Sequence, residues 1–373
     1  MDRFTEKLTP FMVMDILSRA RKMPDAVHME VGEPDIPPSE KVIEAYQRAI
    51  REGMFHYTPA GGLPELREKI SEYYQNRYGL TVPVERIIIT PGTSGAFLVA
   101  LYLTTSSEKP LCISDPSYPC YKNFSYFLGA EPVMIPIGRE NNYQIRPSEI
   151  PDPSGIGALL ISSPSNPTGN IYERDNLASL TALSEKEGFF LISDEIYHGL
   201  VYEKSEETAL CFSDRAIVIN GFSKYFCMPG FRVGWMILPG KLVRKAEIII
   251  QNIFIAANTP AQYAALEAFD DEHLEFVKTE YRRRRDILYN GLRDIFDIDA
   301  EPDGAFYIWA DISRYSDDSV RFSEELLEKV QVAVTPGVDF GSHNTRNHIR
   351  LAYTRKEEEL SEGISRIRKF LGV

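Results

Sequence analysis

The sequence is poor in cysteine and has no long apolar run. None of the four cysteines, Cys112, Cys120, Cys211 and Cys227, has CxxC spacing, and the first residues do not read as a secretion signal. No apolar run reaches the roughly 20 residues that a membrane-spanning helix needs. We therefore expect a protein of the reducing cytoplasm that does not enter a membrane.

Basic residues are outnumbered by acidic ones. The sequence contains 41 Lys and Arg residues and 54 Asp and Glu residues, which gives a formal net charge of −13. This negative charge opposes binding to nucleic acid or anionic lipid. The one basic run, Arg282–Arg285, lies where apolar residues recur at helical spacing. The side chains of four consecutive helical residues point in different directions around the helix axis and form no single basic stripe. The run therefore predicts a solvated, partly paired helix and no nucleic-acid partner.

A metal site is not expected either. The six histidines are scattered, and His343 and His348 are too far apart for the HExxH pattern and have no acidic residue between them.

The distribution of apolar residues predicts an α/β fold. Between about Glu85 and Leu238, short apolar runs alternate with amphipathic stretches, as in a mostly parallel sheet wrapped by helices. Seven strands are predicted in this region, over residues 86–90, 110–114, 133–137, 157–162, 189–193, 216–220 and 232–238.

The rest of the chain predicts a second, smaller α+β domain. A chain of 373 residues exceeds the size at which one core stops growing. After Gln251 we expect a long helix around 272–295, then strands over 305–312 and 348–354, a helix near 319–331 and a last helix. The amphipathic N-terminal residues join this part. The large domain is expected over 36–270, and the small one over 1–35 and 271–373.

Side chains suited to ligand binding follow five of the predicted strands. Open α/β sheets bind ligands beyond the carboxyl ends of their strands. The segments at those ends are PGTSGA, DPSYP, SPSNPTGN, DEIYHG and GFSK. They bring flexible backbone, an aromatic ring, an amide, a carboxylate with a tyrosine, and a lysine to one edge. Together they predict a pocket.

One part of this pocket is suited to phosphate. PGTSGA precedes a helix, whose first N–H groups can bind a phosphate, although a simple tight turn explains the segment equally well. It does not match GxxxxGK[ST], so a nucleoside-triphosphate loop is not indicated. Ser223 and Arg232 flank Lys224 and are placed to close on the same phosphate, which a bidentate arginine suits.

Asp194 and Lys224 suggest the chemistry. Asp194 ends an apolar strand, where it either caps a helix or keeps a ring nitrogen of a cationic heterocycle protonated. Burial and nearby cations would lower the pKa of Lys224 from about 10.4, so that its amine can attack an aldehyde. Phosphate, aldehyde and pyridinium nitrogen are the groups of pyridoxal 5′-phosphate, which proteins bind through a lysine and an acidic partner.

The chain resembles the class I aminotransferases, pyridoxal-phosphate enzymes of fold type I in the aspartate/aromatic aminotransferase superfamily. The resemblance implies transfer of an amino group between an L-amino acid and a 2-oxo acid, through a Schiff base on Lys224 and a pyridoxamine intermediate. The motifs that carry it are VGEPD (31–35), HYTPAGGLPELREKI (56–70), PGTSGA (91–96), DPSYPCY (115–121), SPSNPTG (163–169), SDEIYHGLVYE (193–203), GFSKYFCMPGFRVGW (221–235), TPGVDFG (335–341) and HIRLAYT (348–354).

The resemblance also implies roles at the cofactor ring. Lys224 forms the Schiff base and then moves a proton between the substrate α-carbon and the cofactor C4′. Asp194 pairs with the pyridinium nitrogen. Asn166 and Tyr197 bond the ring hydroxyl oxygen, and Tyr118 stacks on the ring. His198 either supports Tyr197 or is an ordinary loop histidine.

Further roles follow for the phosphate and the substrate. Thr93, Ser94, Ser223 and Arg232 hold the phosphate. Tyr57 reaches the phosphate of a neighbouring subunit, which implies a homodimer with shared active sites. The substrate is bound by Gly32, Asn166 and Arg350, with Arg350 pairing with its α-carboxylate.

Two departures from the family pattern remove no charge or donor that these roles need. Many relatives have two glycines where this chain has Gly92 and Thr93, and an alanine or serine near Cys227 and Met228.

Two alternatives stay open: another reaction on the same cofactor, such as C–S β-elimination or decarboxylation, and an effector-binding regulator domain with little turnover. A regulator would carry a DNA-binding domain ahead of motifs that here begin at about Val31.

The residue that reads the substrate side chain is not evident from the sequence. Phe11, Met12, Phe226 and Phe254 are apolar candidates. The frequency of activities in the family favours aspartate or a broad range of amino acids, with 2-oxoglutarate as acceptor.

Overall fold

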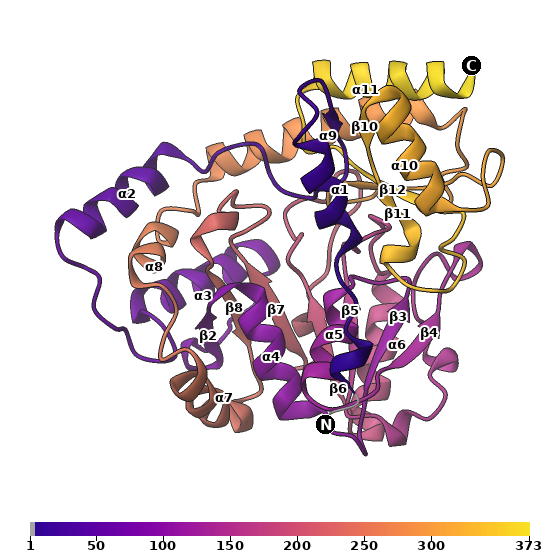
Figure 1. Ribbon diagram of the computed structural model, residues 1–373. Coiled ribbons are helices and arrows are strands. Elements are labelled where there is room, and N and C mark those ends of the chain that lie inside the picture. Colours follow the sequence, from indigo (N-terminus) through magenta and orange to yellow (C-terminus); the bar gives the residue numbers. More distant parts are fainter. Residues whose placement is uncertain (1–3) are drawn as a thin grey trace.

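A seven-stranded sheet forms the centre of the computed structural model, which describes residues 4–373 (Figure 1). Its strand order is β2-β8-β7-β6-β5-β3-β4, and only β8 runs antiparallel to its neighbours. All seven predicted strands are present: β2 (Ile87–Thr90), β3 (Leu111–Asp115), β4 (Val133–Pro136), β5 (Ala158–Ser162), β6 (Phe190–Asp194), β7 (Ile217–Gly221) and β8 (Gly234–Ile237).

Helices cover both faces of this sheet, which explains why its strands read as continuous apolar runs. Successive side chains of a strand point to opposite faces. Ile87 and Ile89 pack into one apolar core, whereas Ile88 packs into the other. The core around Ile88 is closed by α4 (Gly92–Thr104), α5 (Cys120–Phe127) and α7 (Gly240–Ile253), and the opposite core by α3 (Pro64–Tyr78) and α6 (Arg174–Glu187), among others.

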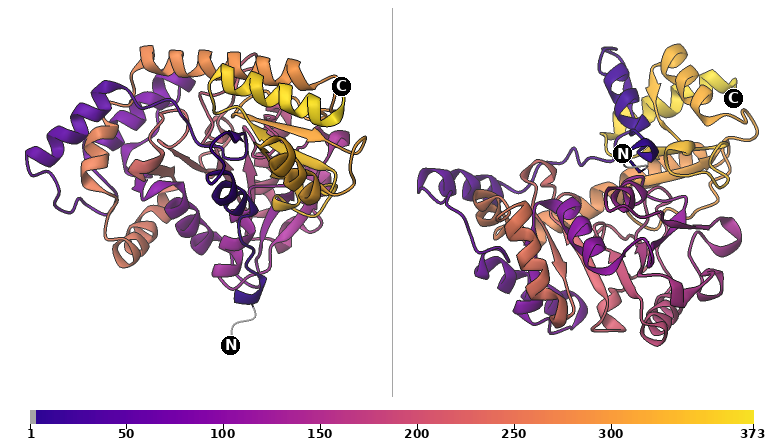
Figure 2. Two further views of the ribbon diagram at one scale, coloured as in Figure 1. Left: turned by 45° about the horizontal axis from the view of Figure 1, so that its top comes forward. Right: turned by 60° about the horizontal axis from the view of Figure 1, so that its bottom comes forward.

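A smaller antiparallel sheet lies beyond the large one, in the order β11-β12-β9. Its strands are β9 (Tyr307–Asp311), β11 (Thr335–Pro336) and β12 (His348–Ala352). Helices α9 (Asp271–Leu292) and α11 (Glu357–Leu371) lie side by side over it, and α10 (Ser319–Val330) packs against α11 (Figures 1 and 2).

The N-terminal segment packs against this smaller part. Strand β1 (Val27–His28) pairs in parallel with β10 (Val332–Ala333), and α1 (Met12–Ala20) lies against β10 and β11. The chain then crosses to α2 (Glu40–Arg51), which packs on α8 (Thr259–Ala265) at the far side of the large sheet (Figure 1). Strands β1, β10 and β11 are absent from the predicted set, because two residues are too few to show an alternation.

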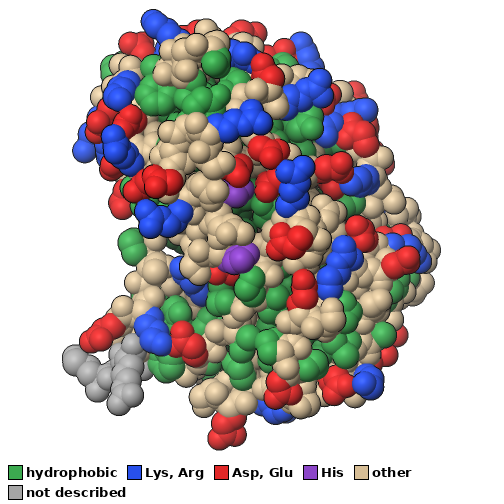
Figure 3. All heavy atoms as spheres, turned by 90° about the vertical axis from the view of Figure 1, so that its right-hand side faces the viewer, with side chains coloured by type: hydrophobic (Ala, Val, Ile, Leu, Met, Phe, Trp, Pro, Cys, Tyr) green, Lys and Arg blue, Asp and Glu red, His purple; other side chains and the backbone are tan. Residues whose placement is uncertain are grey.

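The basic run Arg282–Arg285 lies on α9 and is fully paired, with one departure from expectation. Arg282 and Arg285 bond Glu203, and Arg283 pairs with Glu357. Arg284 is buried rather than solvated, and its Nη1 lies 2.6 Å from Asp35 Oδ1. Acidic and basic side chains are interspersed over the face seen in Figure 3.

Neither a membrane-spanning helix nor a metal cluster occurs within residues 4–373. No helix in that range is both long and apolar enough to cross a membrane. The same residues contain no group of three or more His, Cys, Asp or Glu side chains that could hold a metal ion.

Candidate active site

A cavity of about 280 Å³ lies at the carboxyl edge of the large sheet, facing the smaller sheet. Strands β5, β6 and β7 end there, and the smaller sheet contributes Tyr307 and Arg350. Nine of the twelve predicted site residues line it, namely Gly32, Thr93, Tyr118, Asn166, Asp194, Tyr197, Ser223, Lys224 and Arg350, whereas Ser94, Arg232 and Tyr57 do not.

Lys224 extends into this cavity from the segment after β7. Its Nζ donates a hydrogen bond to the carbonyl oxygen of Gly32 at 2.7 Å. Burial, together with the nearby guanidinium of Arg350, lowers the pKa of the amine to about 8. The neutral form, which is the nucleophile towards an aldehyde, is therefore accessible near neutral pH.

Asp194 is the last residue of β6 and is 4% exposed. Its Oδ1 accepts a hydrogen bond from the Ile196 N–H at 3.1 Å, and its Oδ2 accepts one from the Tyr121 hydroxyl. Burial raises the pKa of this carboxyl to about 6. The helix-cap alternative is wrong, because the chain enters a turn after β6 rather than a helix.

Arg350 is held rigidly on β12. Its Nη1 donates to Asn166 Oδ1 at 2.8 Å, and its Nη2 donates to the carbonyl oxygen of Glu30 at 2.5 Å. The guanidinium carbon lies 4.3 Å from the ring centroid of Tyr307 and 4.7 Å from that of Phe340. These contacts fix the plane of the guanidinium, while its buried Nε has no hydrogen-bond partner in the described chain.

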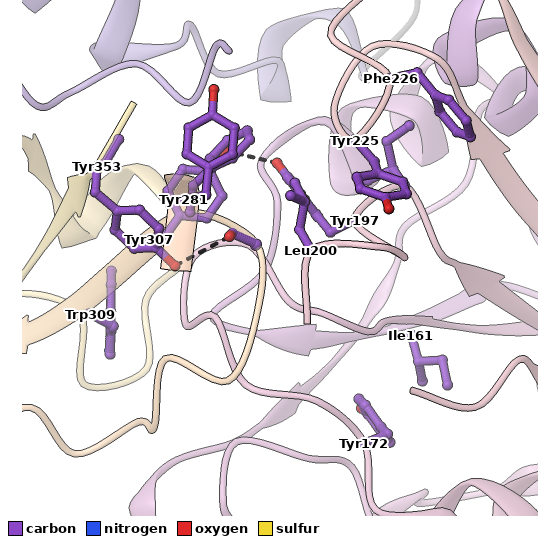
Figure 4. Packing of buried hydrophobic residues seen from close by; sticks show 14 of the residues in the cluster. Ile161, Tyr172, Tyr197, Leu200, Tyr225, Phe226, Tyr281, Tyr307, Trp309 and Tyr353 are labelled. Carbon is purple, nitrogen blue, oxygen red and sulfur yellow. Dashed lines mark hydrogen bonds between the residues drawn. The ribbon is translucent and has the colours of Figure 1, made fainter. Parts of the chain in front are cut away.

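Aromatic residues close the cavity around Tyr197 and Tyr118. The hydroxyls of Tyr197 and Tyr307 lie 2.8 Å apart, and Figure 4 labels both residues among the buried aromatic side chains. The Tyr118 ring packs edge-on against Tyr121, with centroids 5.4 Å apart. Tyr118 therefore presents a ring to the cavity without filling it.

The segments predicted to bind phosphate are more open. Arg232, with a φ of 59°, is exposed and donates from Nη1 to the Pro229 carbonyl oxygen at 3.0 Å. Its Nη2 would lie 2.7 Å from a Cβ at Gly92, so only glycine permits this approach to the first turn of α4. Thr93 lines the cavity, Ser94 is exposed outside it, and Tyr57 is 80% exposed.

His198 is buried behind the turn that carries Tyr197 and does not line the cavity. Its Nδ1 lies 2.7 Å from the Tyr78 hydroxyl and 3.5 Å from Glu195 Oε2. Glu195 Oε1 accepts from the Ala209 N–H at 2.9 Å. The histidine is therefore part of a polar network that supports the turn, rather than an ordinary loop residue.

Among the lining residues to which the sequence assigned no role are Tyr121, Tyr307, Asp339 and Phe340. Tyr121, Asp339 and Phe340 lie inside motifs quoted above, and Tyr307 lies in the strand predicted over 305–312, but the spacing does not show on which side of the backbone each side chain lies. Of the four apolar candidates for reading a substrate side chain, only Phe11 lines the cavity. Phe226 instead packs against Phe222 and Trp235 in the core.

Comparisons with known proteins show the family of the chain. A family model described as "Aminotransferase class I and II" matches residues 24–367. Among curated relatives, the chain is 36% identical to the (5-formylfuran-3-yl)methyl phosphate transaminase of Methanocaldococcus jannaschii, over 97% of this chain and 96% of the relative. It is 35% identical to the valine–pyruvate aminotransferase of Mycobacterium tuberculosis, with the same coverage of both chains.

Solved structures extend the similarity to the fold. An aminotransferase from Mycobacterium tuberculosis superposes with a TM-score of 0.94 at 34% identity, covering 98% of this chain and 97% of the other. Thermus thermophilus aspartate aminotransferase with maleate superposes with a TM-score of 0.92 at 31% identity, covering 99% of each chain.

Proposed function

The chain belongs to the class I and II aminotransferase family, and from that premise we propose that Lys224, Asp194 and Arg350 form the centre of its active site. Members of the family use pyridoxal phosphate, so the chain is a pyridoxal-phosphate-dependent aminotransferase. The observation that carries the site assignment is that one cavity holds an amine with a lowered pKa, a buried carboxylate and a rigid guanidinium.

The residues around the cavity fit the cofactor. Asp194 is a buried carboxylate with no cation bonded to it, which suits a protonated ring nitrogen. Arg232 and the first N–H groups of α4 meet where Gly92 leaves room, and they would hold the phosphate. When bound, the cofactor supplies an aldehyde for the amine and a ring that withdraws electrons from the substrate α-carbon.

Asn166 and Tyr197 would orient the ring. The Asn166 amide oxygen already accepts a hydrogen bond from Arg350, which leaves the amide NH₂ as the group that can donate to the ring hydroxyl oxygen. Tyr197 shares a hydrogen bond with Tyr307, which fixes the direction of its hydroxyl. Tyr118 would stack on one face of the ring.

Arg350 and Lys224 would act on the substrate. The guanidinium, clamped between two aromatic rings, would pair with the α-carboxylate that all donors and acceptors share. The neutral Lys224 Nζ would take the proton from the α-carbon and later return one. In the complete cycle a second 2-oxo acid receives the amino group that the first amino acid gives up, so no outside oxidant or reductant is needed.

Borohydride reduction of the holoenzyme tests the site. We expect the label on the peptide that contains Lys224, and absorbance should show the cofactor passing from its aldehyde to its amino form when an amino acid is added. Lys224→Ala should abolish both signals, with a loss of rate of at least about 10³-fold because proton transfer is removed as well. The exposed Lys241 provides a matched Lys241→Ala control that should behave as wild type. Label on another lysine would refute the assignment.

We also propose a cytoplasmic homodimer with shared active sites. The support comes from large apolar side chains that are exposed in the single chain: Tyr57 is 80% exposed, Tyr102 64%, Phe55 59% and Ile253 58%. A symmetric pair would bury such side chains and let each Tyr57 reach the other subunit's phosphate. The cysteines, all unpaired among the described residues, are compatible with a reducing compartment.

Subunit hybrids test the sharing. Chains with Tyr57→Ala and chains with Lys224→Ala should each be poorly active, and mixing them should restore activity because one of the two sites is then intact. Sedimentation should give the mass of two chains. Full activity of a monomer would contradict the proposal.

The division into domains is likewise a proposal, with 36–270 as the large domain and 1–35 with 271–373 as the small one. Residues 1–3 of the latter lie outside the described residues. The pairing of β1 with β10 supports it, because it ties the N-terminal segment to the C-terminal sheet.

A further inference from the structure

The part of the cavity left for a substrate side chain is almost wholly apolar. This part is a wall formed by Phe11, Val13, Met14, Asp339 and Phe340, which we call the side-chain subsite. It lies between the two groups that fix the substrate, because Phe340 stacks on Arg350 and Phe11 contacts Tyr118, with ring centroids 5.9 Å apart. A side chain on an α-carbon held by Arg350 and placed against the cofactor ring would therefore meet this wall.

The one ionisable group in the side-chain subsite is an acid. Asp339 is 5% exposed, and its two carboxylate oxygens accept hydrogen bonds from the Met12 and Val13 N–H groups at 3.0 and 3.3 Å. These are the first N–H groups of α1, which would otherwise suit a negatively charged ligand. Asp339 thus fastens α1 over the cavity and occupies its anion-binding end.

The cations near the cavity already have other tasks. Lys224 and Arg350 are the only lysine and arginine that line it within residues 4–373, and the proposed function uses both. Lys122 lies close enough to affect Asp339 electrostatically, but it is outside the lining. Within residues 4–373 of one chain, a second carboxylate on the substrate would face apolar walls and a carboxylate, without a cation in the lining to neutralise it.

We propose that this aminotransferase acts on L-amino acids with uncharged, apolar side chains and on the corresponding monocarboxylic 2-oxo acids, and that Asp339 excludes dicarboxylates. This inference rests on the proposed function of the site. It differs from the expectation based on family frequency, because aspartate and 2-oxoglutarate both place a second carboxylate in the side-chain subsite.

A single-turnover panel on the holoenzyme tests the substrate class. L-Leucine, L-phenylalanine and L-methionine should convert the cofactor to its amino form with kcat/KM about 100-fold above L-aspartate and L-glutamate, since a buried unpaired charge is strongly disfavoured. Calorimetry provides a readout without turnover, in which 4-methylpentanoate should bind more tightly than succinate. Aspartate reacting as fast as leucine would overturn the substrate class, whichever cation is responsible.

Asp339→Asn tests the residue. Asparagine keeps an acceptor for α1 but loses the charge, so the ratio of aspartate to leucine kcat/KM should rise about 10-fold. Asp15→Asn, an exposed change on the same helix, is the matched control and should leave that ratio unchanged. An unchanged ratio in a folded Asp339→Asn protein would refute the role of Asp339. Acidic activity that Lys122→Met abolishes would show that Lys122 reads the side chain and would overturn the proposal.

The two proposals fail differently. If no donor converts the cofactor and borohydride does not label Lys224, the proposed function fails, and the substrate class fails with it. If the label is on Lys224 and acidic donors react best, only the substrate class fails.

Discussion

The two ends of the cavity differ in how much of the binding site one chain completes by folding. At the end that we propose binds the substrate, Arg350 is 4% exposed, bonded to Asn166 and Glu30, and flanked by two aromatic rings. At the phosphate end, Arg232 is exposed, and within residues 4–373 its guanidinium donates one hydrogen bond, to Pro229. Contacts within the chain thus fix the guanidinium at the proposed substrate end, whereas few such contacts hold the guanidinium at the proposed phosphate end.

This difference has energetic consequences. A charge in a buried, hydrogen-bonded setting interacts strongly because little water screens it, and removing its partner leaves an unpaired charge. An exposed charge gains less because water and salt screen it. Substitutions at the substrate end should therefore have larger effects, with weaker dependence on salt.

The largest effect is expected for Arg350→Ala. It should lower kcat/KM for every donor, by a factor that corresponds to about 2–5 kcal/mol of lost transition-state stabilisation. The reason is that all donors present the same α-carboxylate to a desolvated guanidinium. Arg350→Lys should retain part of the activity, since lysine keeps the charge but not the bidentate geometry. The exposed Arg346 offers Arg346→Ala as a matched control. Loss confined to acidic donors would show that Arg350 reads the side chain instead.

Asp194→Asn should stabilise the cofactor-free protein at neutral pH while weakening cofactor binding. Burial raises the pKa of Asp194 from 3.8 to about 6. The folded protein therefore binds the proton more tightly than the unfolded chain, and the contribution of Asp194 to the free energy of unfolding is full below pH 3.8 and is lost as the pH rises through about 6. Removing the charge should restore about 2–3 kcal/mol at pH 7.5, because one pKa unit corresponds to about 1.4 kcal/mol.

Urea unfolding of the cofactor-free wild type and Asp194→Asn at pH 7.5 and pH 5 measures this gain. The gain should be smaller at pH 5, where the wild-type carboxyl is already largely protonated. An equal gain at both pH values would mean that the effect comes from packing and not from the charge.

The smallest effect is expected at the phosphate end. Arg232→Ala should weaken binding of the cofactor to the cofactor-free protein by about 1.5–3 kcal/mol, the usual value of a hydrogen bond to a charged group. Because Arg232 is exposed, the loss should shrink as salt is added, which an absorbance titration at two ionic strengths would measure. Arg244→Ala, on the exposed face of α7, is the control. A loss larger than that of Arg350→Ala would invert the comparison between the two ends.

The sequence predicted the large sheet well because its strands are buried on both faces and end in Gly, Pro, Ser or Asp. For the same reason β9 and β12 were found within a few residues of their observed ends. The short strands β1, β10 and β11 were missed because they form through pairing between segments that are distant in the sequence.

The candidate site was predicted in part. Asp194, Asn166 and Lys224 follow strands of a parallel sheet, so their convergence at one edge could be inferred from the sequence alone. Tyr307 and Asp339 were missed because their positions depend on how the smaller sheet faces the large one. Their positions in the sequence do not contain that information.

The amino-acid sequence by itself determined the fold class, the family and the residues that converge at the sheet edge, because periodicity and strand ends are local properties of the chain. Only the tertiary structure decided what surrounds them. It brought Asp339 against the first N–H groups of α1, left Arg232 exposed beside Gly92, and placed Arg350 between the rings of Tyr307 and Phe340. Burial and charge environment arise from packing between distant segments, and they set the pKa values of Lys224 and Asp194.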